Sequence, residues 1–261
     1  MSAYQNIFKR YEMKYLISRA QYERLKEGMG PYMTGDSFGR SVICNIYFDT
    51  LDFLLIRRSI DHPVYKEKLR LRSYGIAQPD SRVFVELKKK YDAVVYKRRV
   101  PMKEYEAMAY LLEGQRGNQQ GQILKEIDYA LAYYKSLEPA MFLSYRREAF
   151  YGKENREFRI TFDEKIQWRE YDLSLCSGDY GTPLLKKEQV LMEIKTGTSI
   201  PLWMTALLSQ NHIYKTTFSK YGTAYRSLMA QGQLVGRSAV FVMSKEKNAG
   251  PFLSPQAVSQ I

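Results

Sequence analysis

The chain has 261 residues, of which 40 are Lys or Arg and 28 are Asp or Glu, so its formal net charge is +12. A composition that is 45% hydrophobic and 14% aromatic can bury a core and excludes disorder as the main state. No stretch approaches the roughly 18 uninterrupted apolar residues that a membrane-spanning helix needs, and the N-terminus lacks the apolar segment of a secretory signal. The excess of cations predicts a polyanionic partner, but charge alone does not separate nucleic acid, phosphate polymer and anionic lipid.

Cysteine and histidine are scarce, which limits the chemistry. Only Cys44 and Cys176 are present, far apart in the chain, so a disulfide scaffold or a cysteine metal site is disfavoured and a reducing, cytoplasmic location is expected. The two histidines, His62 and His212, are too few for a multi-histidine metal site, and a Ser-His-Asp triad would need one of them in a rare position.

Hydrophobic periodicity predicts the elements in chain order. The first part of the chain predicts a strand over Arg10–Ile17, a helix over Ser18–Gly28 and strands over Ile43–Phe48, Lys66–Ser73, Val83–Lys90 and Val94–Val100. The second part predicts helices over Met102–Glu113 and Gln122–Leu137, strands over Phe142–Ala149, Glu157–Phe162 and Val190–Lys195, and helices over Pro201–Ile213 and Ser219–Gln231. Eight strands with mostly short connections favour an antiparallel sheet or barrel over a doubly wound sheet.

The domain organisation is expected to be simple. No Pro-, Gly- or Ser-rich linker divides the body of the chain, so residues 1–232 are predicted to form one domain. Residues 233–261 contain Pro, Gly and Ser and are predicted to form a weakly ordered C-terminal tail.

The strands carry their charges at alternate positions, so each strand has one charged face. In the third predicted strand, Leu69 and Leu71 take the face opposite the cations. The cations of the charged faces are Arg10, Lys14, Lys66, Lys68, Arg70, Arg72, Lys88, Lys90, Lys97, Arg99, Arg147, Arg159 and Lys195, and the anions are Glu12, Glu86, Glu157 and Glu193. These 13 cations and 4 anions give 13 − 4, or +9, so most of the net charge lies on strands.

Two interpretations of the charged faces stay open. Each strand could belong to a half-exposed sheet whose charges are solvated. Alternatively, the sheet curls so that the charged faces line a lumen and the apolar faces point outward under the helices. We favour the lumen, because like cations opposite one another destabilise a sheet unless a bound polyanion compensates them.

The residue types on these faces suit phosphate. Arginine binds phosphate oxygens as a fork and lysine binds them as a point charge, so Arg70 and Arg72 could grip neighbouring phosphates of one chain. Carboxylates in a cationic field instead suit a hard divalent cation. The pattern Glu-x-Lys recurs at Glu12, Glu86 and Glu193. Each glutamate either pairs with the lysine two residues on or binds a metal, and the three recurrences favour a metal for at least one of them.

An ordered set of motifs extends this interpretation. The motifs are K-Y-L-I, Y-F-D-T, K-L-R-L-R-S-Y-G, F-V-E-L-K-K-K, Y-K-R-R, Y-R-R-E-A-F, R-I-T-F-D, M-E-I-K and F-S-K-Y, between Phe8 and Tyr225. The set resembles the polyphosphate polymerase domain of the vacuolar transporter chaperone (VTC) family, a branch of the triphosphate tunnel, or CYTH-like, enzymes. The resemblance implies an α+β fold, namely a closed tunnel of eight antiparallel strands with helices packed outside.

The resemblance also implies a function. It implies that the γ-phosphoryl group of ATP is transferred to a polyphosphate chain in the tunnel, with Mn or Mg as the divalent metal. Carried over motif by motif, the implied catalytic residues are Arg70, Arg72, Lys88, Arg147, Arg159 and Lys220. The expected substrate-binding cations are Lys14, Lys68, Lys90, Lys97, Arg99 and Lys195. Glu193 matches the metal-binding glutamate, and Glu12 and Glu86 are further metal candidates.

The sequence departs from the wider pattern in two places. Tunnel triphosphatases open with E-x-E-x-K, whereas this chain has Arg10 at the first position of that frame. The missing carboxylate weakens a two-metal hydrolase and suits the polymerase branch. Thr217 stands where a basic residue often precedes F-S-K, which removes one phosphate contact. Since no membrane helix follows the motifs, transport of a product across a membrane would need a membrane partner protein.

Three functions remain open. The first is the polymerase, the second is a triphosphatase that hydrolyses tripolyphosphate or nucleoside triphosphates, and the third is a non-catalytic module that binds polyphosphate or RNA. The motif G-x-x-x-x-G-K-[ST] is absent, so a P-loop is unsupported. Because most of the net charge lies on strands, a linear phosphate chain is favoured as the partner over duplex nucleic acid or a membrane surface. We expect neither sequence-specific nucleic-acid binding nor membrane insertion.

Overall fold

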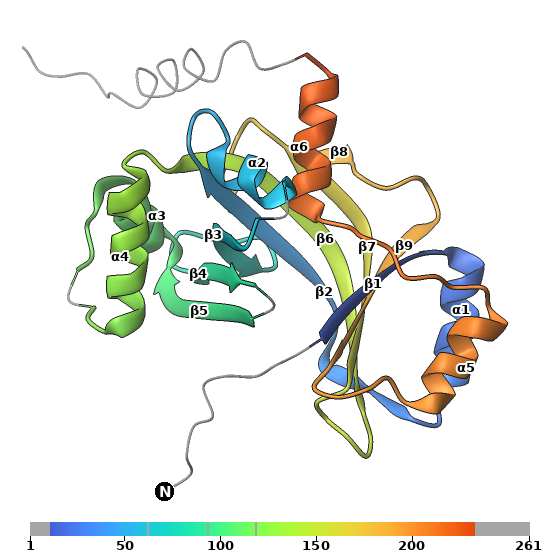
Figure 1. The fold of residues 1–261 in the computed structure, drawn as a ribbon. Coiled ribbons are helices and arrows are strands. Elements are labelled where there is room, and N and C mark those ends of the chain that lie inside the picture. The colour runs from blue at the N-terminus through green and yellow to red at the C-terminus, as the bar shows by residue number, and fades with distance from the viewer. Residues whose placement is uncertain (1–10, 62, 93, 118, 233–261) are drawn as a thin grey trace, which may run out of the picture. The chain divides into compact units, whose positions relative to one another are not determined.

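A computed structural model describes residues 11–61, 63–92, 94–117 and 119–232, and these have an α+β fold (Figure 1). The strands are β1 (Tyr11–Ser18), β2 (Met33–Asp49), β3 (Tyr65–Tyr74), β4 (Arg82–Tyr91), β5 (Val94–Lys103), β6 (Glu138–Gly152), β7 (Arg159–Arg169), β8 (Thr182–Pro183) and β9 (Gln189–Thr196). The helices are α1 (Arg19–Met29), α2 (Leu54–Ile60), α3 (Glu104–Glu113), α4 (Gln122–Tyr134), α5 (Leu202–Gln210) and α6 (Lys220–Ala230). Arg10 and the predicted tail over residues 233–261 lie outside the described residues.

The strands form one antiparallel sheet, which confirms that part of the prediction. Its order is β1-β9-β7-β6-β2-β3-β4-β5, and β8 pairs with the end of β7. Within the described residues no hydrogen bonding joins the terminal strands β1 and β5, so the closed barrel expected from the resemblance is not confirmed. The sheet is nevertheless strongly curled, because Glu12 on β1 and Lys88 on β4 are close enough to shift each other's pKa although their strands are not neighbours.

Several elements differ from the prediction, and three of the differences bear on the site. β2 begins at Met33, ten residues before the predicted start, because its first part pairs with the end of β6 although it lacks hydrophobic alternation. β7 runs to Arg169 and so includes Asp163, which the prediction left out. Helix α2 was not predicted, and its first turn is held by the buried Asp49 carboxylate, which accepts hydrogen bonds from the backbone N–H groups of Leu55 and Ile56 at 2.8 and 3.0 Å.

Local signals predict other boundaries correctly. Ser18 is the N-cap of α1, as expected, because its Oγ accepts a hydrogen bond from the Gln21 N–H at 3.2 Å. The Gln21 side chain accepts a hydrogen bond from the Ser18 N–H in return, at 2.9 Å. This reciprocal capping box satisfies two backbone donors that the helix itself leaves unpaired.

The apolar faces of the strands pack under helices. One core cluster includes Leu69, Leu71 and Val85 of β3 and β4 together with residues of α3 and α4. A second cluster includes Tyr15 of β1 and Met192 of β9 together with residues of α1 and α5. Figure 1 shows the same arrangement, with α3 and α4 beside β3–β5 and with α1 and α5 beside β1 and β9. The opposite, charged face of the curled sheet is therefore its inner face.

The contacts between residues divide the chain into two units, Met1–Tyr225 and Arg226–Ile261, and the boundary falls within α6. The sheet and the residues of the site described below belong to the first unit. That residues 1–232 form one domain stays a prediction. Among the helices that the structure describes, none has the length and apolar composition needed to cross a membrane.

Candidate functional site

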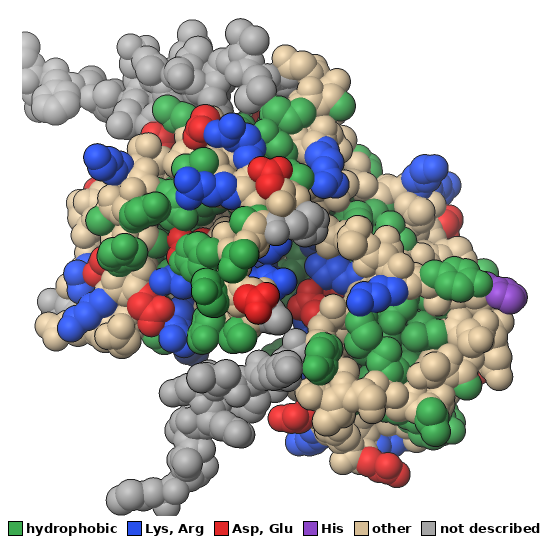
Figure 2. Space-filling view, viewed as in Figure 1, with side chains coloured by type: hydrophobic (Ala, Val, Ile, Leu, Met, Phe, Trp, Pro, Cys, Tyr) green, Lys and Arg blue, Asp and Glu red, His purple; other side chains and the backbone are tan. Residues whose placement is uncertain are grey.

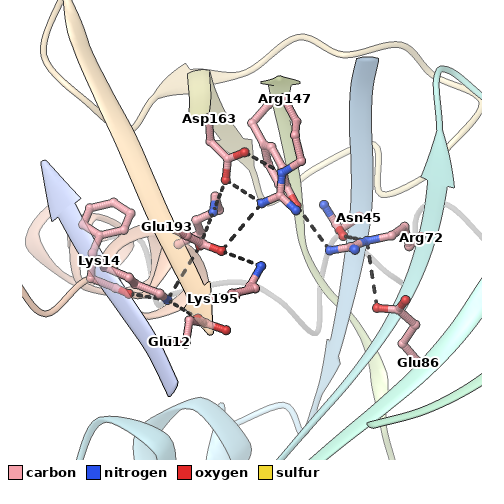
Figure 3. A network of polar contacts seen from close by, with 12 residues as sticks. Glu12, Lys14, Asn45, Arg72, Glu86, Arg147, Asp163, Glu193 and Lys195 are labelled. Carbon is pink, nitrogen blue, oxygen red and sulfur yellow. Dashed lines mark hydrogen bonds and ion pairs between the residues drawn. The ribbon is translucent and has the colours of Figure 1, made fainter. Parts of the chain in front are cut away.

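Charged side chains from seven strands and from the start of α6 meet on the inner face of the sheet. The space-filling view shows Lys and Arg side chains around a recess in this face, with Asp and Glu side chains among them (Figure 2). Figure 3 shows that the side chains labelled there point toward one another from strands on both sides of the recess. The ion pairs fall into two groups, each centred on a buried carboxylate.

The first group, the Glu86 cluster, consists of Glu86, Arg70, Arg72, Lys97 and Arg99. Arg70 donates hydrogen bonds to Glu86 Oε2 from Nε at 2.8 Å and from Nη2 at 2.6 Å. Arg99 Nε donates to Oε1 at 2.6 Å, and Lys97 Nζ lies 3.0 Å from the same oxygen. Burial alone would raise the pKa of Glu86, but Arg70 and Arg72 outweigh it and hold that pKa far below its usual range.

This environment favours an ion-pair role for Glu86 over the metal-ligand role. Both carboxylate oxygens already accept hydrogen bonds or ion pairs from cations, and the side chain is 1% exposed. The partners also differ from the expected one. They come from the facing positions of β3 and β5, where Arg70 and Arg99 are directly opposite Glu86, and not from Lys88 on the same strand.

The second group, the Glu193 cluster, consists of Glu193, Asp163, Arg147, Lys220, Lys14 and Lys195. Figure 3 labels all of these residues except Lys220. Asp163 is fully buried and accepts two hydrogen bonds from Arg147, at 2.6 and 2.7 Å. Lys220 Nζ bridges the two carboxylates, 2.6 Å from Asp163 Oδ2 and 3.1 Å from Glu193 Oε1. Burial opposes ionisation of Asp163, but Arg147 and Lys220 outweigh it and lower its pKa.

The other two lysines of the Glu193 cluster, Lys195 and Lys14, lie farther from its carboxylates than Lys220 does. Lys195 Nζ is 3.2 Å from Glu193 Oε2, and Lys14 Nζ is 3.9 Å from Oε1 and 3.4 Å from Glu12 Oε1. Burial raises the pKa of Glu193, but Lys220, Lys195 and Lys14 lower it well below its usual range. Lys14 therefore lies between Glu12 and Glu193. Burial and the negative charge of Glu193 oppose ionisation of Glu12, but Lys88, Lys195 and Lys14 outweigh them and lower its pKa.

Besides Asp163, the sequence analysis missed Asn45, Tyr47 and Tyr145 of the inner face. Arg72 donates to Asn45 Oδ1 at 2.9 Å and to the Tyr145 hydroxyl at 3.2 Å, and Arg70 donates to the Tyr47 hydroxyl at 3.0 Å. Burial raises the pKa of Tyr145, but the nearby guanidinium and ammonium groups outweigh it and lower it to about 8. Strand alternation could have identified these residues. They have the same parity as the charged residues, meaning that they occupy the alternate strand positions whose side chains point to the charged face.

Four lysines of the inner face have too little negative charge around them. Lys66 lies directly opposite Lys90 across the β3–β4 pair, and Lys68 lies opposite Lys88. Lys68 donates a hydrogen bond to the Ser219 hydroxyl at 3.2 Å. Burial, with the charges of Lys88 and neighbouring cations, lowers the pKa of Lys68 to about 7. Such crowding destabilises the protein without a ligand and is relieved by a bound polyanion.

Two predicted catalytic residues lie in neither cluster. Lys88 lies on the inner face, opposite Lys68. The other residue is Arg159. Its side chain is 47% exposed, and its nearest carboxylate is that of Asp36 at 4.0 Å. In the sheet it lies opposite Lys195 and Tyr151, at the start of β7. Arg159 therefore stands at the rim of the charged face.

The inner face contains oxygen donors that fit a divalent metal. No group of three His, Cys, Asp or Glu side chains with metal-site geometry occurs among the described residues. Glu12 and Glu193 nevertheless both contact Lys14, and the Thr161 hydroxyl, directly opposite Glu193, is buried without a hydrogen-bond partner among the described residues. Mg²⁺ is commonly held by one or two carboxylates and by the phosphates of a substrate. Glu193, Glu12 and Thr161 fit that arrangement, whereas Glu86 does not.

Comparison with known proteins identifies the family. The model of the VTC domain family matches residues 9–229, and no curated protein matches the chain. The crystal structure of a candidate adenylate cyclase from Bacillus halodurans has a TM-score of 0.50 and 18% identity to this chain, covering 82% of this chain and 94% of that one.

Two further solved structures are similar at lower scores. A candidate adenylate cyclase from Vibrio parahaemolyticus has a TM-score of 0.46 and 14% identity, covering 85% of this chain and 99% of that one. An adenylyl cyclase candidate from Hippeastrum, described as having a dominant triphosphatase activity, has a TM-score of 0.49 and 15% identity. The match covers 87% of this chain and 99% of that one. Because the family model covers most of its length, the chain belongs to the VTC domain family.

Proposed function

We propose that the protein is a metal-dependent polyphosphate polymerase, which transfers the γ-phosphoryl group of ATP to a polyphosphate chain held on the inner face of the sheet. The observation that carries this proposal is the crowding of cations there, with Lys66 opposite Lys90 and Lys68 opposite Lys88. A linear polyanion would relieve this repulsion along the whole row. Membership in the VTC domain family supports the same conclusion.

The proposal includes an enclosed path for the chain. Side chains of β1 and β4 approach each other across the inner face, since Glu12 and Lys88 shift each other's pKa. We propose that they complete a tunnel that backbone hydrogen bonds leave open between β1 and β5. Enclosure excludes water and strengthens every charge interaction with the phosphates.

The reaction needs little covalent help from the protein. A terminal phosphate oxygen of the chain attacks the γ-phosphorus, the bond from that phosphorus to the β–γ bridging oxygen breaks, and ADP leaves with the electron pair. The attacking oxygen is already anionic near pH 7, so no histidine base is needed. Glu193, Glu12 and Thr161 would hold a divalent metal, which neutralises phosphate charge when bound.

The cations have distinct tasks in this mechanism. Arg147 and Lys220 are held in place by the buried Asp163 before substrate binds, and they would stabilise charge on the transferring group. Arg70 and Arg72 are oriented by Glu86, Tyr47 and Asn45 and would grip neighbouring phosphates as forks. The more loosely held lysines would contact the rest of the chain.

One assay tests the proposal. The purified protein with ATP and Mn²⁺ is expected to form ADP and an acid-labile polymer. Glu193→Ala is expected to lower the rate by about 10²-fold or more, the effect of removing one preorganised transition-state group. The matched control is Glu23→Ala, which removes an exposed carboxylate on α1 and leaves the site intact.

The products separate the proposal from its alternatives. Release of orthophosphate without polymer would assign a triphosphatase, in which water attacks in place of a phosphate. Polyphosphate binding without turnover of any triphosphate would assign a non-catalytic module. Either result would overturn the polymerase.

A further inference from the structure

Two aromatic side chains stand at one end of the charged face. Tyr74 closes β3 and is 53% exposed, and Phe84 lies on β4 with its ring centroid 5.7 Å away in an edge-to-face contact. Both have the strand parity of the charged residues, since Tyr74 follows Arg72 by two positions and Phe84 precedes Glu86 by two. Tyr74 and Phe84, the aromatic platform, therefore continue the same inner face.

Arg99 joins the aromatic platform to the Glu86 cluster. Its Nη2 donates a hydrogen bond to the Tyr74 hydroxyl at 2.9 Å, and its Nε donates to Glu86 at 2.6 Å. The guanidinium carbon lies 4.3 Å from the centre of the Phe84 ring and 5.8 Å from that of Tyr74. One side chain thus contacts both the platform and the carboxylate that orients the cations.

The chemistry of the aromatic platform differs from that of the rest of the inner face. The face of an aromatic ring carries negative electrostatic potential, so a phosphate gains nothing by lying on it. Nucleobases, in contrast, stack on tyrosine and phenylalanine rings and on guanidinium planes. Tyr74, Phe84 and Arg99 together offer these surfaces beside the cations.

The spacing fits a nucleotide. Tyr74 is four residues beyond Arg70 on β3, which corresponds to about 13 Å at about 3.3 Å per residue. This is comparable to the span of an extended nucleoside triphosphate from base to terminal phosphate. Tyr65, on the same strand, and Tyr91, on β4, are also exposed, but both have the opposite parity and belong to the outer face.

We propose that Tyr74 and Phe84 bind the base of the nucleoside triphosphate donor while its phosphates contact Arg70, Lys97 and Arg99. The inference rests on the proposed function, because it assumes that the donor is a nucleotide. It predicts that the site distinguishes ATP from inorganic tripolyphosphate, which carries the same phosphates without a base.

Calorimetric titration of the full chain with ATP and with tripolyphosphate tests this inference. Tyr74→Ala is expected to weaken ATP binding by about tenfold or more, the size of one lost stacking contact, and to leave tripolyphosphate binding within about twofold. Tyr74→Phe keeps the ring and loses the hydroxyl that Arg99 contacts, so ATP binding is expected to persist. The matched control is Tyr11→Ala, since Tyr11 is 51% exposed but has the opposite parity on β1.

Three outcomes would overturn the inference. Equal weakening of ATP and tripolyphosphate by Tyr74→Ala would mean that Tyr74 acts through the position of Arg99. An unchanged ATP affinity in Tyr74→Ala would mean that the base is not bound there, while polymer formation from ATP would leave the proposed function standing. If the wild-type protein bound neither triphosphate, the inference and the proposed function would fail together.

Discussion

Glu86 and Glu193 are both buried carboxylates surrounded by four cations, but the two surroundings differ. Around Glu86 three cations approach to 2.6, 3.0 and 2.5 Å and one stays at 3.9 Å. Around Glu193 the four distances are 3.1, 3.2, 3.8 and 3.9 Å. The Glu86 side chain is 1% exposed, whereas that of Glu193 is 8% exposed.

The neighbours of the two carboxylates differ as well. Among the described residues, the ion-pair partners of Glu86 engage both of its oxygens, so its charge is used in orienting those cations. Glu193 lies near a second carboxylate, Glu12, and opposite the unpartnered hydroxyl of Thr161. A carboxylate saturated by cations, such as Glu86, orients the side chains around it. A less tightly paired carboxylate beside an unsatisfied hydroxyl, such as Glu193, leaves positions for a ligand.

Removing the charge of Glu86 is expected to destabilise the protein more than removing that of Glu193. Glu86→Gln leaves Arg70, Lys97 and Arg99 without their counter-charge and is expected to lower the free energy of unfolding by about 3 kcal/mol, the low end for breaking a buried ion pair because the partners are partly exposed. Glu193→Gln is expected to lower the free energy of unfolding by clearly less, because Asp163 still pairs with Arg147 and Lys220. Urea unfolding of both variants measures the difference, and equal losses would contradict the comparison.

A smaller effect concerns pH. Burial lowers the pKa of Lys68 to about 7 and that of Lys97 to about 8, so the ligand-free protein loses these charges as pH rises above 7. A phosphate chain favours the protonated lysines, so tripolyphosphate affinity is expected to fall about tenfold between pH 7 and about 8.5, with proton uptake on binding. The unfolded chain keeps the Lys68 proton up to its ordinary pKa, so the stability of the ligand-free protein should rise over the same range.

Calorimetry in buffers of different ionisation enthalpy measures the proton uptake. Lys68→Met is the matched variant, because it removes the group that titrates at about 7 and keeps a similar side-chain length. Its tripolyphosphate affinity should vary less with pH than that of the wild type. An equal pH dependence in both proteins would show that Lys68 is not the titrating group.

The smallest expected effect tests the open position beside Glu193. Thr161→Val replaces a buried hydroxyl that has no partner, and it is expected to raise the free energy of unfolding by about 1 kcal/mol. The same change should weaken tripolyphosphate binding in the presence of Mn²⁺ by several-fold, because a ligand contact is lost. Thr161→Ser keeps the hydroxyl and serves as the control. A variant that binds as tightly as the wild type would mean that only water contacts Thr161.

Much of the site could be predicted from strand alternation, and the residues that this prediction missed or misplaced have identifiable causes. Parity along β3 and β4 was enough to group Arg70 with Glu86 on one face, because successive side chains of a strand point to opposite sides. Asp163 was missed because the predicted strand ended one residue too early, although the motif R-I-T-F-D contains it. Arg159 has the right parity, but parity does not indicate that it stands at the rim.

The residues that share a face, the position of most helices and the excess of positive charge on the strands could all be predicted from the sequence. These properties depend on the local geometry of the backbone and on the order of residue types. The folded structure was needed to show which cation contacts which carboxylate, that Glu86 is saturated and Glu193 is not, and that no backbone pairing joins β1 and β5 in the described sheet. Those outcomes depend on strand register and on the curl of the sheet, which arise from contacts between residues distant in the chain.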